Sequence, residues 1–210
     1  MSLSKQQRGL SILEILIGIA ISLIVIAAII GLFANSISGS QRVLDRGKLD
    51  RDLFAAMDVM TYDIERAGFW SNATNGATTN PFMTGTNDLT TNASTNCLTF
   101  SYDKNTDGTN TTNDQFGYGL SGSAIQFRQG GTTCATNTVG AGWSSLTDTN
   151  VITISSFQVT STNVTVSGSN TNATNYRTVT ITLTGNLAND ATNTRTITRT
   201  IKLYNNKYTP

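Results

Sequence analysis

The chain has 210 residues, a net charge of +1 and no histidine, and only 13% of its residues are charged. This length has room for one membrane helix and one globular domain with a modest core. Without histidine the Ser-His, Cys-His and His-metal catalytic arrangements are excluded, and the near-neutral charge gives no electrostatic basis for nucleic-acid binding. Composition therefore predicts neither an enzyme of these classes nor a nucleic-acid partner.

A long apolar segment follows a short basic leader. Lys5 and Arg8 precede Gly9, and Glu14 is the only charged side chain in residues 10–34. About 20 apolar residues, at about 1.5 Å each, span the roughly 30 Å hydrocarbon core of a bilayer as a helix. In a secretory signal peptide the small cleavage residue follows the apolar region. Here it precedes that region, so a cut after Gly9 would leave the helix on the mature protein.

This N-terminal pattern resembles the class III signal of type IV pilins and pseudopilins. The pattern is a basic leader ending in Gly, one apolar residue, Ser, two aliphatic residues, Glu and a long apolar helix. The resemblance implies that a prepilin peptidase cuts between Gly9 and Leu10 and methylates the new N-terminus at Leu10. It also implies that Glu14 neutralises the N-terminal amine of a neighbouring subunit in a filament. The alternative is a Glu14 that only reaches the membrane interface.

A second helical segment is predicted behind the apolar run. Its apolar residues recur at intervals of three and four, which marks one face of an α-helix, and Gly68 would end it. We therefore expect one helix from about residue 11 to about residue 67, the second half of which packs on a sheet. The predicted apolar face comprises Leu49, Leu53, Met57, Met60, Ile64 and Ala67.

The sequence DIERAGFW at residues 63–70 points to one subgroup of this superfamily. It is similar to a signature of PilW-type minor pilins, and the J pseudopilin of type II secretion carries a related version. The resemblance implies a structural subunit that takes part in pilus assembly, with prepilin peptidase, other major and minor pilins and the inner membrane as partners. A J-type pseudopilin and a tip-located adhesin or binding module remain the alternatives.

Strands are predicted in the C-terminal part. Residues 176–183 and 195–203 alternate between polar and apolar side chains, and we expect them to pair antiparallel across a long Thr/Asn loop. Residues 151–159 also alternate, but their phase slips at Ser155 and Ser156, as it does at a β-bulge.

These elements predict an α+β protein with the type IV pilin fold, a long N-terminal helix packed on an antiparallel β-sheet. The expected parts are a cleaved leader, a transmembrane and filament-core helix, its amphipathic continuation and a β-rich periplasmic domain with long Thr/Asn loops. Their bounds are 1–9, 10–34, 35–68 and 69–210.

Two cysteines, Cys97 and Cys134, are present. The globular domain of a pilin faces the oxidising periplasm, so we predict that they form one disulfide. Two separate free thiols are the alternative.

One polar loop has the spacing of a calcium site. Residues 103–108 read D-x-N-x-D-G, with Asp103, Asn105 and Asp107 at the ligand positions and Asp114 at the twelfth position. An EF-hand-like loop needs oxygen ligands at these positions and Gly at the sixth. A solvated turn is the alternative, because Asn, Asp and Gly are common in turns. No other cofactor is predicted.

Overall fold

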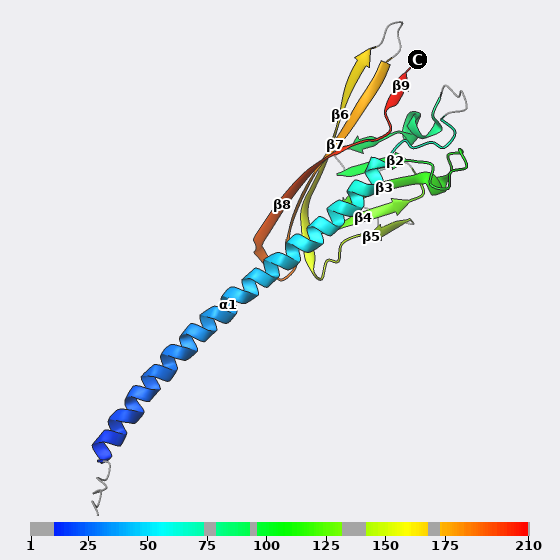
Figure 1. Ribbon diagram of the computed structural model, residues 1–210. Coiled ribbons are helices and arrows are strands. Elements are labelled where there is room, and N and C mark those ends of the chain that lie inside the picture. Colours follow the sequence, from blue (N-terminus) through cyan, green and yellow to red (C-terminus); the bar gives the residue numbers. More distant parts are fainter. Residues whose placement is uncertain (1–10, 74–78, 93–95, 132–141, 168–172, 210) are drawn as a thin grey trace, which may run out of the picture. The chain divides into compact units, whose positions relative to one another are not determined.

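The computed structural model describes residues 11–73, 79–92, 96–131, 142–167 and 173–209 (Figure 1). The chain forms two compact units, Met1–Arg46 and Gly47–Pro210. The long helix α1 (Ile12–Glu65) contributes residues to both units. It confirms the predicted long N-terminal helix, and its last residue lies two positions before the expected end.

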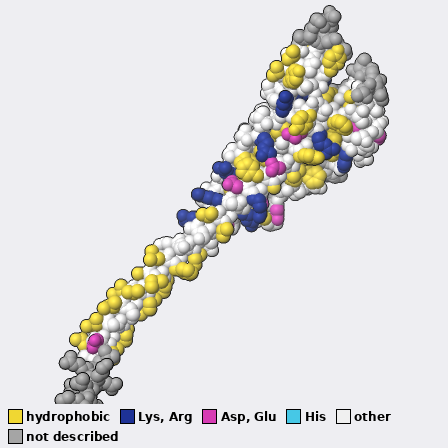
Figure 2. All heavy atoms as spheres, viewed as in Figure 1, with side chains coloured by type: hydrophobic (Ala, Val, Ile, Leu, Met, Phe, Trp, Pro, Cys, Tyr) yellow, Lys and Arg dark blue, Asp and Glu magenta, His cyan; other side chains and the backbone are white. Residues whose placement is uncertain are grey.

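In the first unit, α1 carries an uncovered apolar surface. All of its described side chains up to Arg46 are exposed, among them Ile24 at 70% and Phe33 at 67%. Figure 2 shows hydrophobic side chains along this part of α1. By length and composition α1 could cross a membrane. Because so much apolar surface is unfavourable in water, this segment needs lipid or other protein chains around it.

In the second unit the strands form two antiparallel sheets, where the sequence predicted one. The first sheet has the order β1-β2-β3-β4-β5. Its strands are β1 (Thr90–Asn92), β2 (Cys97–Ser101), β3 (Gln115–Ser121), β4 (Ala124–Gln129) and β5 (Trp143–Ser145). Short 3₁₀ helices at Pro81–Met83 and Gly85–Asn87 precede β1, and another at Thr112–Asp114 lies between β2 and β3.

The second sheet has the order β6-β7-β8, with β9 also paired to β7. Its strands are β6 (Ile152–Ser167), β7 (Ala173–Leu187), β8 (Asp190–Lys202) and β9 (Lys207–Thr209). A register shift between Ile154 and Ser156 confirms the predicted bulge. The prediction of a long loop between the last two long strands is wrong, because β7 ends at Leu187 and β8 begins at Asp190. Threonine is β-branched and favours strands, so the Thr-rich sequence extends both strands.

The core of the second unit lies between α1 and the two sheets. The predicted apolar face is confirmed, since each of its six residues is at most 2% exposed. On the first sheet it meets Phe100 and Tyr118, and on the second it meets Phe157 and Ile181, all within one buried cluster. A side chain at Gly185 of β7 would lie 3.1 Å from Leu53 Cδ2. This glycine therefore lets the helix pack closely on the sheet.

The turn after α1 requires glycine. Gly68 has φ +76°, and a Cβ there would lie 2.1 Å from the side chain of Met83. Its amide donates to the carbonyl of Ser101 in β2 (2.8 Å), while the amide of Asp103 donates to the carbonyl of Phe69 (2.9 Å). These bonds join the Ala-Gly-Phe turn to the first sheet. The predicted end of the helix at Gly68 thus has a structural reason.

Candidate functional site

The first turn of α1 has the sequence Ser11-Ile12-Leu13-Glu14. The carbonyl of Ser11 accepts from the amide of Glu14 (3.0 Å), and its hydroxyl accepts from the amide of Leu13 (3.3 Å). Ser11 therefore caps the helix, because it satisfies amides that have no partner within the helix. Glu14 lies in the first turn, where a negative charge interacts favourably with the helix dipole.

The side chain of Glu14 is exposed on a helix whose other described side chains in residues 12–33 are uncharged. A carboxylate in apolar surroundings is costly unless a positive group neutralises it. The predicted positive group is the N-terminal amine of a neighbouring filament subunit, which cleavage by prepilin peptidase exposes. Gly9 and Leu10, the predicted cleavage and methylation residues, lie outside the described residues.

The second half of α1 carries polar links to both sheets that periodicity did not predict. The hydroxyl of Tyr118 in β3 donates to Asp63 Oδ2 (2.5 Å). Burial raises the pKa of Tyr118 above its usual range, and this hydrogen bond raises it further. On the other sheet, Arg199 of β8 pairs with Asp58. Arg66 lies over the ring of Tyr102, 4.2 Å from its centroid, and burial raises the pKa of Tyr102 to about 12.

A partly buried ion cluster joins three distant parts of the second unit. Asp88 accepts from Arg177 of β7 and from Lys207 of β9, the latter at 2.6 Å. The side chain of Arg177 is 5% exposed and that of Asp88 is 17% exposed. No pattern in the sequence predicted this cluster, because its members are 89 and 119 residues apart.

The cysteines are described only in part. Cys97 begins β2, is 4% exposed and is disulfide-bonded, while Cys134 lies outside the described residues. Pairing with Cys134 stays a prediction. Digestion of the unreduced protein, followed by mass spectrometry, should give one cross-linked peptide pair that contains Cys97 and Cys134. Two separate alkylated cysteine peptides would contradict it.

The predicted calcium loop is held by hydrogen bonds within the protein. Asp103 Oδ2 accepts from the amide and hydroxyl of Ser71 (3.1 and 2.5 Å) and from the amide of Gly108 (3.0 Å). Asp114 accepts from the amide of Lys104 (3.1 Å) and, as a capping box, from Thr111. Both aspartates are 1% exposed. They therefore organise the turn through hydrogen bonds inside the protein.

The remaining ligand positions interact with each other. Asn105 donates to Asp107 Oδ2 (2.7 Å). Within the described part of the chain, no group of three His, Cys, Asp or Glu side chains is placed to hold a metal ion. Asp103 Oδ1 is buried without a hydrogen-bond partner.

The hydrogen bonds to Asp103 predict a pH-dependent stability. Burial acts to raise the pKa of Asp103, but the bonds from Ser71 and Gly108 outweigh it and hold the pKa below its ordinary value of 3.8. A carboxylate whose pKa is lowered by folding stabilises the folded state at every pH above its ordinary pKa. This contribution to stability disappears as the pH falls through the lowered pKa.

We therefore expect Asp103→Asn to destabilise the protein at about pH 7, and we expect its difference from the wild type to shrink as the pH falls below the ordinary pKa of 3.8. Chemical unfolding of both proteins across this range measures the difference in their free energies of unfolding. A difference that is independent of pH would contradict the assigned role of the charge.

Comparison with protein families gives two matches. Residues 42–203 match prepilin peptidase-dependent protein B, and residues 4–30 match the prokaryotic N-terminal methylation motif. Comparison with curated proteins and with solved structures gave no match. The first family match covers more than half of the chain, and the second contains the predicted cleavage site and Glu14. The chain therefore belongs to the prepilin peptidase-dependent protein B family, a pilin-like family, and carries a prepilin-type methylation motif.

Proposed function

We propose that this chain is a structural minor pilin of a type IV pilus, of the PilW type, and that it acts in pilus assembly. The observation that carries the proposal is the exposed apolar surface of α1, which begins within the prepilin methylation motif and continues beyond it. In the membrane, lipid covers this surface. In a filament, the helices of neighbouring pilins would cover it instead, because packed apolar side chains also keep it from water.

The proposal includes a route through the cell. The precursor lies in the inner membrane with its second unit in the periplasm, prepilin peptidase cuts it after Gly9, and the mature chain joins other pilins through α1. The disulfide at Cys97 fits an oxidising compartment. No enzymatic activity and no nucleic-acid partner are part of this proposal.

Mass spectrometry of sheared surface fibres from the native host tests the proposal. We expect the chain in the fibres with a methylated Leu10 as its first residue, and we expect a deletion strain to lose pili. A variant with Gly9 replaced by a bulky residue is the control, since it should stay uncleaved in the membrane. An uncleaved wild-type chain would overturn the proposal.

The same deletion strain separates the pilus from a type II secretion pseudopilus. Normal pili together with exoproteins retained in the periplasm would make the chain a J-type pseudopilin. A strain with normal pilus numbers but no adhesion would make it a tip-located binding module.

Calcium binding at the loop of residues 103–114 stays a second proposal. Calorimetric titration of the detergent-solubilised chain with Ca²⁺ tests it, with Asp103→Asn as the control. Heat of binding that the variant lacks would support a calcium site, and no heat together with an unchanged melting temperature would exclude it.

A further inference from the structure

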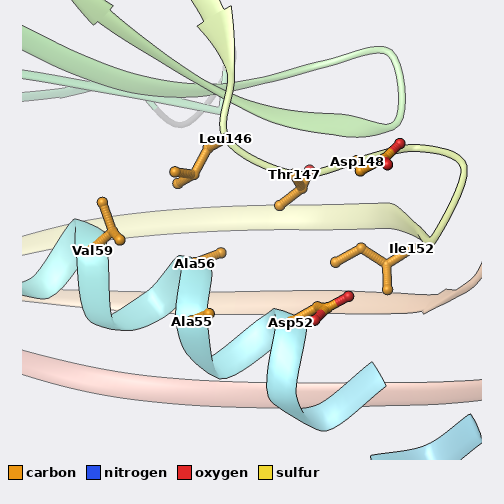
Figure 3. Close-up of a pocket in the computed structure, with 8 residues that line it drawn as sticks. All are labelled: Asp52, Ala55, Ala56, Val59, Leu146, Thr147, Asp148 and Ile152. Atoms are coloured by element: carbon orange, nitrogen blue, oxygen red, sulfur yellow. The ribbon is translucent and has the colours of Figure 1, made fainter. Parts of the chain in front are cut away.

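A groove lies between α1 and the segment that leads into β6. It has a volume of about 300 Å³, and all of its lining residues belong to the second unit (Figure 3). Ala56 and Ile152, at 4% and 1% exposure, form its buried base. The groove is lined by Asp52, Ala55, Ala56, Val59, Leu146, Thr147, Asp148 and Ile152.

The two ends of this groove differ in chemistry. In Figure 3, Val59 and Leu146 lie toward one end, and the carboxylates of Asp52 and Asp148 lie toward the other. Val59 remains 46% exposed although it lines a concave surface. The groove therefore offers apolar contact along its length and negative charge at one end.

The negative charge at this end is only partly balanced. Asp52 pairs with Arg51 (2.8 Å), whose side chain is 70% exposed, so the pair is a weak surface interaction. Asp148 Oδ1 accepts from the amide and the side chain of Asn150, both at 2.9 Å. These donors are neutral, and they orient the carboxylate without compensating its charge. The groove thus has an excess of one negative charge.

The groove continues into an exposed apolar stripe on α1. Ala55, Val59 and Tyr62 are spaced by four and three residues and are all exposed, Tyr62 at 66%. Residues at this spacing lie on one face of a helix. A partner that covered the stripe would place its side chains at the mouth of the groove.

We propose that the groove receives an arginine side chain from a neighbouring filament subunit. This inference rests on the proposed assembly into a filament. The aliphatic part of an arginine would cover Val59 and Leu146, and its guanidinium would reach the carboxylates of Asp52 and Asp148. Arginine suits two carboxylates better than lysine does, because its planar group presents several donors in a fixed geometry.

The test is photo-crosslinking in the native host with p-benzoylphenylalanine in place of Tyr62, an exposed aromatic residue on the stripe. We expect an adduct in sheared fibres to an arginine-containing peptide of a protein with a prepilin leader. In the Asp52→Asn/Asp148→Asn background we expect the yield to fall about tenfold or more, since charge-assisted hydrogen bonds are lost. Asparagine removes the negative charge at both positions but keeps a side-chain oxygen that can accept a hydrogen bond, so the variant tests the charge.

The control background is Asp50→Asn/Asp190→Asn, which changes the net charge equally at two residues outside the groove. Its yield should equal that of the wild type. Equal yields in all backgrounds, a peptide without arginine, or a partner without a prepilin leader would each overturn the inference. If the chain is cleaved and present in the fibres while the adduct is missing, the inference fails and the proposed function stands. If wild-type fibres lack the chain, the proposed function fails first.

Discussion

Replacing Glu14 with alanine should remove this protein from surface filaments while its cleavage after Gly9 continues. The variant leaves the amine of a neighbouring subunit without a partner in an apolar contact. Loss of one member of a desolvated ion pair costs about 3–5 kcal/mol. At about 1.4 kcal/mol per tenfold, incorporation should fall by roughly 100-fold or more. The ratio of the chain in sheared fibres to the chain in the membrane, measured by quantitative mass spectrometry, gives the effect.

This magnitude separates the two roles of Glu14. A carboxylate that only stabilises the first turn of α1 contributes about 0.3–1 kcal/mol, which is less than tenfold. Ser22→Ala is the matched control, because it removes a polar group from the same exposed part of α1, where the hydroxyl donates to the carbonyl of Ile19. Near-normal incorporation of the Glu14→Ala chain would rule out the ion pair.

Replacing Asp88 with alanine should lower the free energy of unfolding of the second unit by about 3–5 kcal/mol. The variant leaves Arg177 charged in a position where its side chain is 5% exposed, and within the described residues its side chain then keeps the carbonyl of Asn205 as an acceptor, at 3.2 Å. It also removes the partner of Lys207. Chemical unfolding of the detergent-solubilised chain, followed by the fluorescence of Trp70 and Trp143, measures the loss.

Two further variants test the cause of this loss. Asp50→Ala breaks an exposed pair with Arg195, whose side chain is 52% exposed, and should cost less than about 1 kcal/mol. The double variant Asp88→Ala/Arg177→Met should recover most of the loss, since it also removes the unpaired charge. If Asp50→Ala cost as much as Asp88→Ala, burial of the cluster would not be the cause.

The long helix, its buried face and the prepilin signal can be predicted from local sequence. The apolar face from Leu49 to Ala67 was predictable because helical periodicity brings residues three and four apart to one side. The bulge near Ser155 was predictable because strand alternation changes phase there. The prepilin signal and the position of Glu14 also required no tertiary structure, since the motif is contiguous.

The extent of the C-terminal strands and the division into two sheets depended on which strands pair. Composition predicts loops for the Thr/Asn-rich residues, although threonine also favours strands. Only the pairing of β6, β7 and β8 decides between these two states. The division into two sheets likewise follows from contacts between distant segments.

The sequence alone therefore determined the membrane-length helix, its buried face and the prepilin family features, because each depends on residues within a few turns of one another. Only the tertiary structure decided the ion cluster around Asp88, the bond from Tyr118 to Asp63 and the acidic-ended groove. Each of these brings together side chains from elements far apart in the chain. Periodicity carries no information on such contacts, because it reports which face a residue occupies and not which residue it meets.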